Sequence, residues 1–254
     1  MPDFPVYLAH DHMQRAEDFA RDIDGGVSGK IVHLTIDSWI DAPTKEEYDK
    51  AYNSYEGFRD RGLGALTNLH AVASDPSNHV RVVREFRDLE TARHTGEFAV
   101  IAGNEGGKIL GSDPDLLDAW FGLGLRHVQF NWEMPNKLGA SQDQENHPAQ
   151  PGLTAFGRTT IENMNEKGMI VDVSHSAPQT ILDALEVTNK PILNSHSGGR
   201  AIADKPQNLT DQQIKAMGEN GGVIGIHFCS RLVLGVNGVQ PEIDDVVKQI
   251  RYVA

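Results

Sequence analysis

The chain has 254 residues, a formal net charge of −13 and 39% hydrophobic residues. This length suits one large α/β domain better than two small ones, and it is enough to bury a substantial core. The negative charge argues against nucleic acid or an anionic membrane as a partner.

Cysteine content and apolar runs indicate the compartment. Cys229 is the single cysteine, which excludes an intrachain disulfide and fits a reducing environment. The N-terminal stretch MPDFPVYLAHDH has neither a basic segment nor a long apolar run, so no signal peptide is expected. No apolar stretch approaches the roughly 20 residues that span a bilayer. We therefore expect a cytoplasmic protein.

The first predicted strand is the apolar run at 6–9, which leads into His10-Asp11-His12. Because side chains alternate along a strand, both imidazoles are expected on the same side. The pair can bind a metal ion. Alternatively, one histidine is a ligand and the other lies on the surface, or neither binds.

A second strand and three helical segments come next. Residues 30–36 predict the strand, and His33 inside it is interpreted as a packed or hydrogen-bonded histidine rather than a ligand. The spacing of aromatic and apolar residues predicts helices over 44–61, 63–73 and 86–94.

The third predicted strand, residues 98–102, ends close to Glu105-Gly106-Gly107. Glycines at a strand end let the backbone approach whatever the carboxylate holds. The alternative is an acidic turn residue exposed to solvent. Beyond it, the pattern predicts a helix at 116–123, a fourth strand at 127–130, a long polar loop at 137–151 and a helix at 156–164.

The most informative stretch is 169–200, which predicts a strand–helix–strand unit. Residues 169–173 and 192–193 are the two apolar strands, and Pro178 suits the first turn of the helix between them. His175 and His196 follow the two strands closely. In a parallel barrel the carboxyl ends of the strands carry the chemistry, so the two imidazoles can point at one metal ion.

The remaining segments predict a capped helix after Thr210, a seventh strand at 222–228 and an amphipathic helix at 244–253. Seven strands alternating with helices favour a TIM-type (β/α)8 barrel, with the eighth strand apparently lacking at the C-terminus. We expect residues 1–254 to form a single, C-terminally incomplete barrel domain. The barrel is open, or the chain is truncated, or another chain supplies the last strand.

The candidate metal ligands share one property, which is that each falls at or just past the carboxyl end of a predicted strand: His10, His12, Glu105, His175 and His196. Four imidazoles and a carboxylate suit zinc or another first-row ion better than magnesium or calcium. Five ligands are too many for one tetrahedral site with room for water. They suit two ions bridged by Glu105, which is an arrangement for hydrolysis.

At these residues the chain resembles the renal or membrane dipeptidase family of zinc peptidases. The resemblance is carried by Glu105-Gly106-Gly107, the stretch 152–157, the stretch 171–175, Asn194-Ser195-His196-Ser197 and Asn208-Leu209, with a fainter match at His10. It implies a (β/α)8 barrel with two zinc ions. His10 and position 12 would hold one ion and His175 and His196 the other, with Glu105 as the bridging catalytic carboxylate.

The chain departs from that family at several positions. His12 stands where an aspartate is common, Trp132 aligns with a histidine that polarises the peptide carbonyl, and Gln207 replaces an arginine that binds the substrate carboxylate. Arg200 can substitute for that arginine. The family's acidic residue after strand eight lies beyond Ala254. The candidate substrate-binding residues are Trp132, Asn136, Arg200 and Gln207.

The leading hypothesis is a binuclear zinc hydrolase that cleaves dipeptides. Its expected partner is the small dipeptide substrate, without nucleic acid or membrane, and a homodimer is a candidate assembly. The departures at Trp132 and Gln207 favour, as an alternative, an amidase or lactonase acting on another small substrate. A third hypothesis is an inactive metal-binding remnant that has lost its last strand.

Overall fold

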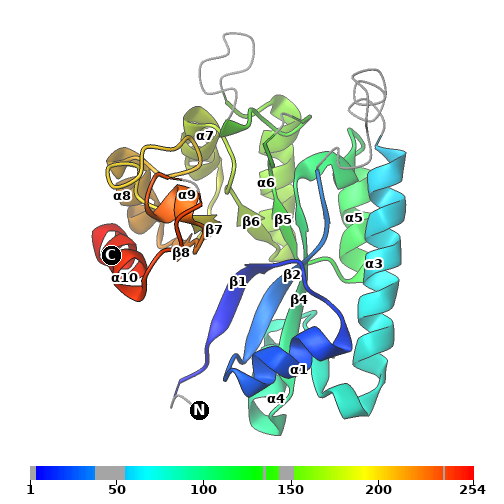
Figure 1. Cartoon of the computed structure of the whole chain (residues 1–254). Helices are drawn as coiled ribbons and strands as arrows, with labels where there is room; N and C mark the ends of the chain where they lie inside the picture. The colour runs from blue at the N-terminus through cyan, green and yellow to red at the C-terminus, as the bar shows by residue number, and fades with distance from the viewer. Residues whose placement is uncertain (1–3, 38–54, 134–135, 143–151, 237) are drawn as a thin grey trace. The chain divides into compact units, whose positions relative to one another are not determined.

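The computed structural model describes residues 4–37, 55–133, 136–142, 152–236 and 238–254. Its contacts divide the chain into two compact units, Met1–Val128 and Gln129–Ala254, which are taken one at a time below. Figure 1 shows the helices and strands of both units in chain order from blue to red.

The first unit is built on a parallel sheet whose strands follow the order β1-β2-β4. These strands are β1 (Tyr7–Asp11), β2 (Gly29–Ile36) and β4 (Phe98–Glu105). A short strand, β3 (Val80–Val82), also pairs with β4, and β5 (His127–Gln129) crosses the boundary between the units. Strands β2 and β4 are buried along nearly their whole length, as expected for parallel strands covered on both faces.

The described helices of the first unit pack against part of this sheet (Figure 1). They are α1 (Ala16–Asp24), α3 (Glu56–Ser74), α4 (Phe86–Thr95) and α5 (Asp115–Leu123), with 3-10 turns η1 (Pro76–Asn78) and η2 (Gly107–Leu110). Fully buried Phe19, Leu69 and Phe98 contribute to the core.

Helix α3 corrects the prediction of two separate helices over 44–61 and 63–73. It runs unbroken through Gly62, where a Cβ atom would lie 2.8 Å from Ile109 Cδ1. This glycine therefore permits close packing and does not end the helix. Residues 44–54 of the first predicted helix lie outside the described residues.

The second unit has three parallel strands in the order β6-β7-β8. They are β6 (Ile170–Asp172), β7 (Leu193–Ser197) and β8 (Val223–Ile226). The helices are α6 (Ala155–Lys167), α7 (Pro178–Val187), α8 (Asp211–Asn220), α9 (Ser230–Val233) and α10 (Ile243–Val253). The predicted capping box is present, with Thr210 Oγ1 accepting from Gln213 N and Gln213 Oε1 accepting from Thr210 N.

All seven predicted strands are present among the described residues, and the sequence pattern missed α1, β3 and α9. The two latter elements have only three and four residues, too few to display a period. Residues 143–151 of the predicted loop lie outside the described part of the chain. Among the described residues, no helix has the length and apolar character required to cross a membrane.

Gly106 and the buried Asp37 explain the glycine pair after Glu105. Gly106 has a φ of 96°, and a Cβ there would lie 2.1 Å from Asp37 Cγ. The Asp37 carboxylate accepts a hydrogen bond from Lys108 N at 2.9 Å, and Asp37 N donates to Glu105 O at 2.9 Å. The glycine therefore makes room for the carboxylate that anchors the end of β4, whereas the sequence had suggested room for a ligand of Glu105.

Gly106→Ala should therefore destabilise the protein by about 1–3 kcal/mol, because alanine meets both an unfavourable φ and the Asp37 carboxylate. Gly64→Ala is the matched control, since Gly64 lies in α3 with nothing within 4 Å of its Cβ position. That control should be neutral or slightly stabilising. Urea unfolding of the two variants measures the difference, and equal stabilities would contradict this account of Gly106.

Candidate metal centre

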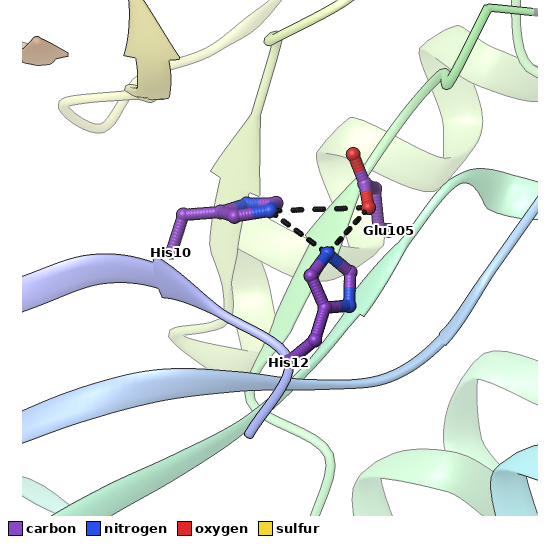
Figure 2. A group of neighbouring side chains, drawn as sticks. All are labelled: His10, His12 and Glu105. Atoms are coloured by element: carbon purple, nitrogen blue, oxygen red, sulfur yellow. Dashed lines mark hydrogen bonds and ion pairs between the residues drawn. The ribbon is translucent and has the colours of Figure 1, made fainter. Parts of the chain in front are cut away.

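Three candidate ligands converge at the carboxyl ends of β1 and β4 in the first unit (Figure 2). His10 Nε2 lies 3.1 Å from His12 Nε2, and Glu105 Oε2 lies 3.0 Å from His12 Nε2 and 3.9 Å from His10 Nε2. The alternation expected along the strand therefore brings both imidazoles to one side, where they face the carboxylate.

The three side chains differ in how much of each is exposed to solvent. Glu105 is 2% exposed, His10 14% and His12 43%, so one edge of the group is open to solvent. The parallel pairing of β2 with β4, from Gly29 opposite Ala99 to Ile36 opposite Glu105, carries the carboxylate to the strand end. A buried carboxylate requires cations or hydrogen-bond donors around it.

His33 agrees with its interpretation as a packed histidine. Its Nδ1 donates to Asp11 O at 3.3 Å, and its ring lies 4.0 Å from the His10 ring. The His127 ring, on β5, lies 5.0 Å from the His33 ring, and Gly103 on the intervening strand β4 leaves room for it. Sequence reasoning did not identify His127 as part of this cluster, because one histidine inside an apolar strand carries no spacing signal.

The second unit holds another pair of facing imidazoles. His175 Nε2 lies 2.9 Å from His196 Nε2, and both residues are 5% exposed. Ser195 Oγ lies 2.9 Å from His196 Nδ1, and Ser174 Oγ lies 3.2 Å from Ser195 Oγ. Contacts at Nδ1 orient the ring and leave Nε2 to bind a metal ion.

Asp172 and the His175 backbone complete this arrangement. The Asp172 carboxylate accepts from Ser174 Oγ at 2.8 Å and from Ser195 N at 3.2 Å, which ties the ends of β6 and β7 together. His175 has a φ of 61°, an uncommon conformation for a residue with a side chain. Such strain persists only where surrounding contacts impose it, and it is frequent at functional sites.

Burial sets the protonation of these histidines. Desolvation lowers the pKa of His175 to about 3, against an opposing effect of Asp172. Desolvation also lowers the pKa of His227, with a further lowering by Arg231, and the His227 ring lies 5.5 Å from His196. Neutral imidazoles are the form that binds metal ions.

Gln207 and Arg231 lie next to the His175–His196 pair. Gln207 Nε2 is 3.3 Å from His175 Nε2 and donates to His196 O at 3.1 Å. Arg231 Nη2 donates to Gln207 Oε1 at 3.2 Å and lies 3.7 Å from Glu133 Oε1. The Trp132 ring lies 6.5 Å from the His175 ring. Arg231 was missed because it lies on α9, a helix too short to be predicted.

The two other predicted substrate-binding residues make contacts with loop backbone. Arg200 donates from Nε to Asn208 O at 3.1 Å and from Nη2 to Pro206 O at 2.6 Å. Asn136 donates from Nδ2 to Phe130 O and accepts from Leu138 N at 2.8 Å. Both side chains brace loops that follow strands, and their roles in binding substrate stay predictions.

The donor set fits a first-row metal ion. Tetrahedral zinc with ligands at about 2.0–2.2 Å places neighbouring ligand atoms roughly 3.3 Å apart. The separations found here run from 2.9 Å for His175 and His196 to 3.9 Å for His10 and Glu105. In the first unit all three donor atoms lie within 4.8 Å of one another.

Solved structures show the same fold. A metallo peptidase from Rhodobacter sphaeroides, liganded with a phosphinate mimic of the dipeptide L-Ala-D-Ala, superposes with a TM-score of 0.85 at 19% identity, covering 98% of this chain and 82% of that one. An amidohydrolase from Pseudomonas aeruginosa gives 0.77 at 20% identity, with 98% and 68% coverage. These likenesses confirm the predicted fold class, an α/β barrel of the TIM type. Together with the donor set, the fold defines a barrel protein with a candidate metal centre.

The profile of the membrane dipeptidase family, peptidase family M19, matches residues 10–254, and the chain belongs to this family. A protein from the PQQ-III 3′ region of Acinetobacter calcoaceticus is 28% identical over 196 residues, 75% of this chain and 62% of the relative. Dipeptidase 3 of Mus musculus is 29% identical over 162 residues, which cover 60% of this chain and 33% of that relative. The chain thus spans less than two thirds of the length of these relatives.

The pKa of His175 predicts a pH-dependent stability. The folded, metal-free protein keeps this imidazole neutral, whereas the unfolded chain takes up a proton near the ordinary value of 6.5. Because the pKa of His175 is lower in the folded state, its contribution to the free energy of unfolding is fully present above about pH 6.5. That contribution is lost progressively as the pH falls toward 3. The free energy of unfolding is measured with urea at several pH values on chelator-treated protein. Between pH 3 and 6.5 it should rise with pH more steeply in the wild type than in His175→Gln, by up to about 1.4 kcal/mol per pH unit. His94→Gln, at an exposed position of α4, is the control; parallel slopes for wild type and His175→Gln would contradict the prediction.

Proposed function

We propose that this protein is a zinc-dependent dipeptidase whose site holds two ions. His10 and His12 would hold one ion and His175 and His196 the second, with Glu105 as the proposed shared ligand. The proposal treats residues 1–254 as one metal-dependent hydrolase domain. The substrate is a dipeptide, and the proposed setting is cytoplasmic.

The observation that carries the proposal is the convergence of His10 Nε2, His12 Nε2 and Glu105 Oε2 at strand ends (Figure 2). Packing alone gives no reason for two imidazole nitrogens to face a buried carboxylate. Family membership supports the activity, as does the dipeptide mimic bound by the Rhodobacter sphaeroides metallo peptidase. Four imidazoles and one carboxylate favour zinc over calcium or magnesium.

A pair of ions bound there would supply Lewis acidity and an activated water for attack on the peptide carbonyl. The protein's own groups supply the rest of the site. The Glu105 carboxylate is 2% exposed and lies 3.0 Å from His12 Nε2, so it supplies a buried negative charge beside the imidazoles of the first unit. Ser195 and Gln207 hold the rings of His196 and His175 in place.

Substrate recognition is proposed for Trp132, Asn136, Arg200 and Gln207. Trp132 offers an aromatic surface near His175, and the Gln207 amide contacts the same histidine. Arg200 brings positive charge to the loop after β7, and Asn136 shapes the loop after β5. A glutamine at position 207 gives a weaker carboxylate contact than a bidentate arginine does.

Metal analysis tests the ligand assignment. Gently purified protein should contain about two zinc ions per chain, and Glu105→Gln should lower both zinc content and dipeptide turnover, the latter by at least about a hundredfold. Glu97→Gln is the matched control, because Glu97 is a partly buried carboxylate paired with Arg81 at 2.6 Å in the same unit. Well under one zinc per chain in the wild type would overturn the proposal and favour an inactive remnant.

A second candidate function is hydrolysis of another amide or a lactone. The observation that favours it is the neutral Gln207 beside His175, at the position where the dipeptidase resemblance expects an arginine. The amidohydrolase from Pseudomonas aeruginosa, which shares the fold, is compatible with it.

A substrate panel separates the two candidates. We expect dipeptides to be cleaved with a kcat/KM at least about tenfold above N-acyl amides and lactones that lack a free carboxylate, because the basic groups near Gln207 favour an anionic end group. Inactivity on dipeptides, together with turnover of neutral amides or lactones, would replace the first function with the second.

A further inference from the structure

The ladder between β1 and β2 is irregular beside the first pair of candidate ligands. Tyr7 pairs with Gly29 and Leu8 with Lys30, but the next pair is Asp11 with Val32. Between these pairs β1 advances three residues while β2 advances two, so β1 carries an extra residue. The irregularity falls at residues 9–10, so regular ladder pairing does not continue through His10, the first of the two candidate ligands.

Register decides which side chains enter the site. His10 and His12 lie on one side of β1, and Asp11 lies on the other. A slip of one residue would exchange these sides, turning Asp11 inward and both imidazoles outward. Asp11 is itself a capable metal ligand, so such a slip would leave a rival carboxylate in the site.

Lys30 on β2 holds Asp11 in place. Its ammonium lies 2.7 Å from Asp11 Oδ2 and 2.7 Å from Asp22 Oδ2, and its side chain is 0% exposed. Nζ also lies 4.9 Å from the Phe19 ring centroid. A buried ammonium that loses an anionic partner is strongly unfavourable. Lys30 therefore favours the register in which Asp11 faces it.

Two further contacts act on the same residue. His33 Nδ1 donates to Asp11 O at 3.3 Å while the His33 ring packs against His10 with a centroid distance of 4.0 Å. Asp11 Oδ1 accepts from Met13 N at 2.9 Å, which secures the chain just past the ligands. Asp11 is thus held through both its carboxylate and its carbonyl.

We propose that Lys30 is a positioning residue for the metal centre, and that its buried ion pair with Asp11 sets the strand register that presents His10 and His12 to Glu105. His33 supports the same register from the other face of β2. This inference rests on the proposed function, since it assigns a role in metal binding.

The test is zinc affinity, measured by competition with a chromogenic chelator on the full chain. Lys30→Met and Asp11→Asn should each weaken binding of one zinc ion by about 10–100-fold. The double variant should bind zinc as tightly as the weaker-binding single variant, because both substitutions remove the same contact between Lys30 and Asp11. Asp11→Asn preserves shape, so it remains informative if Lys30→Met fails to fold.

Asp22→Asn is the matched control. It removes an ion pair of Lys30 with the same 2.7 Å distance but leaves the Asp11 contact in place. We expect its zinc affinity to stay within about threefold of wild type, while its resistance to urea falls as in Asp11→Asn. Equal losses of affinity in Asp22→Asn and Asp11→Asn would show general destabilisation and overturn the inference.

A metal-free measurement provides a second readout. The Cε1–Hε1 NMR signals of His10 and His12 should shift in Asp11→Asn and stay at their wild-type positions in Asp22→Asn. Unchanged signals in both variants would contradict the positioning role even if the wild type binds two zinc ions. Failure of the wild type to bind zinc would instead overturn the proposed function, and the inference with it.

Discussion

Two pairs of histidines in this protein bring their Nε2 atoms to about hydrogen-bond distance, 3.1 Å in the first unit and 2.9 Å in the second. Two neutral imidazoles at that separation are joined either by an N–H···N hydrogen bond, in which one Nε2 carries the proton, or by a cation. Burial lowers the pKa of His175 to about 3, so this ring stays neutral near pH 7, the form that binds a metal ion. A metal ion satisfies both nitrogens, and much of the surrounding structure serves to keep them facing each other.

The contacts that orient these imidazoles come mostly from residues next to them in sequence or on the adjacent strand. Ser195 meets Nδ1 of His196, and Asp172 ties that serine's backbone to the preceding strand. In the first unit Lys30 forms an ion pair with Asp11, the residue between the candidate ligands His10 and His12. Each set needs a charged or polar group buried in a strand, which is costly unless it is paired. The sites therefore account for buried polar groups that packing alone does not explain.

Sequence patterns were sufficient for the strands and for most helices, because buried parallel strands appear as apolar runs and capped helices carry local signals at Pro178 and Thr210. They also placed the five candidate ligands at strand ends, since that requires only strand boundaries. Patterns failed for α3, which was predicted as two helices on either side of residue 62; Gly62 lies within one continuous helix and permits packing against Ile109. They failed for β3 and α9, which are too short to show a period.

Contacts between side chains far apart in the sequence could not be predicted from a single amino-acid sequence. Nothing in the stretch KIVHLTI indicates that Lys30 meets Asp11 and Asp22, or that His33 packs on His10. The position of Arg231 beside Gln207 likewise depends on how α9 follows β8. Such pairings depend on strand register and loop geometry, which local propensity does not encode.

The central claim is that the strand-end histidines bind metal ions. Anomalous diffraction from crystals of the zinc-loaded protein, measured on both sides of the zinc absorption edge, tests it most directly. The account predicts two peaks, one bonded to His10 and His12 and the other to His175 and His196, with Glu105 reaching both. Zinc found only at other side chains, with these imidazoles unligated, would contradict it.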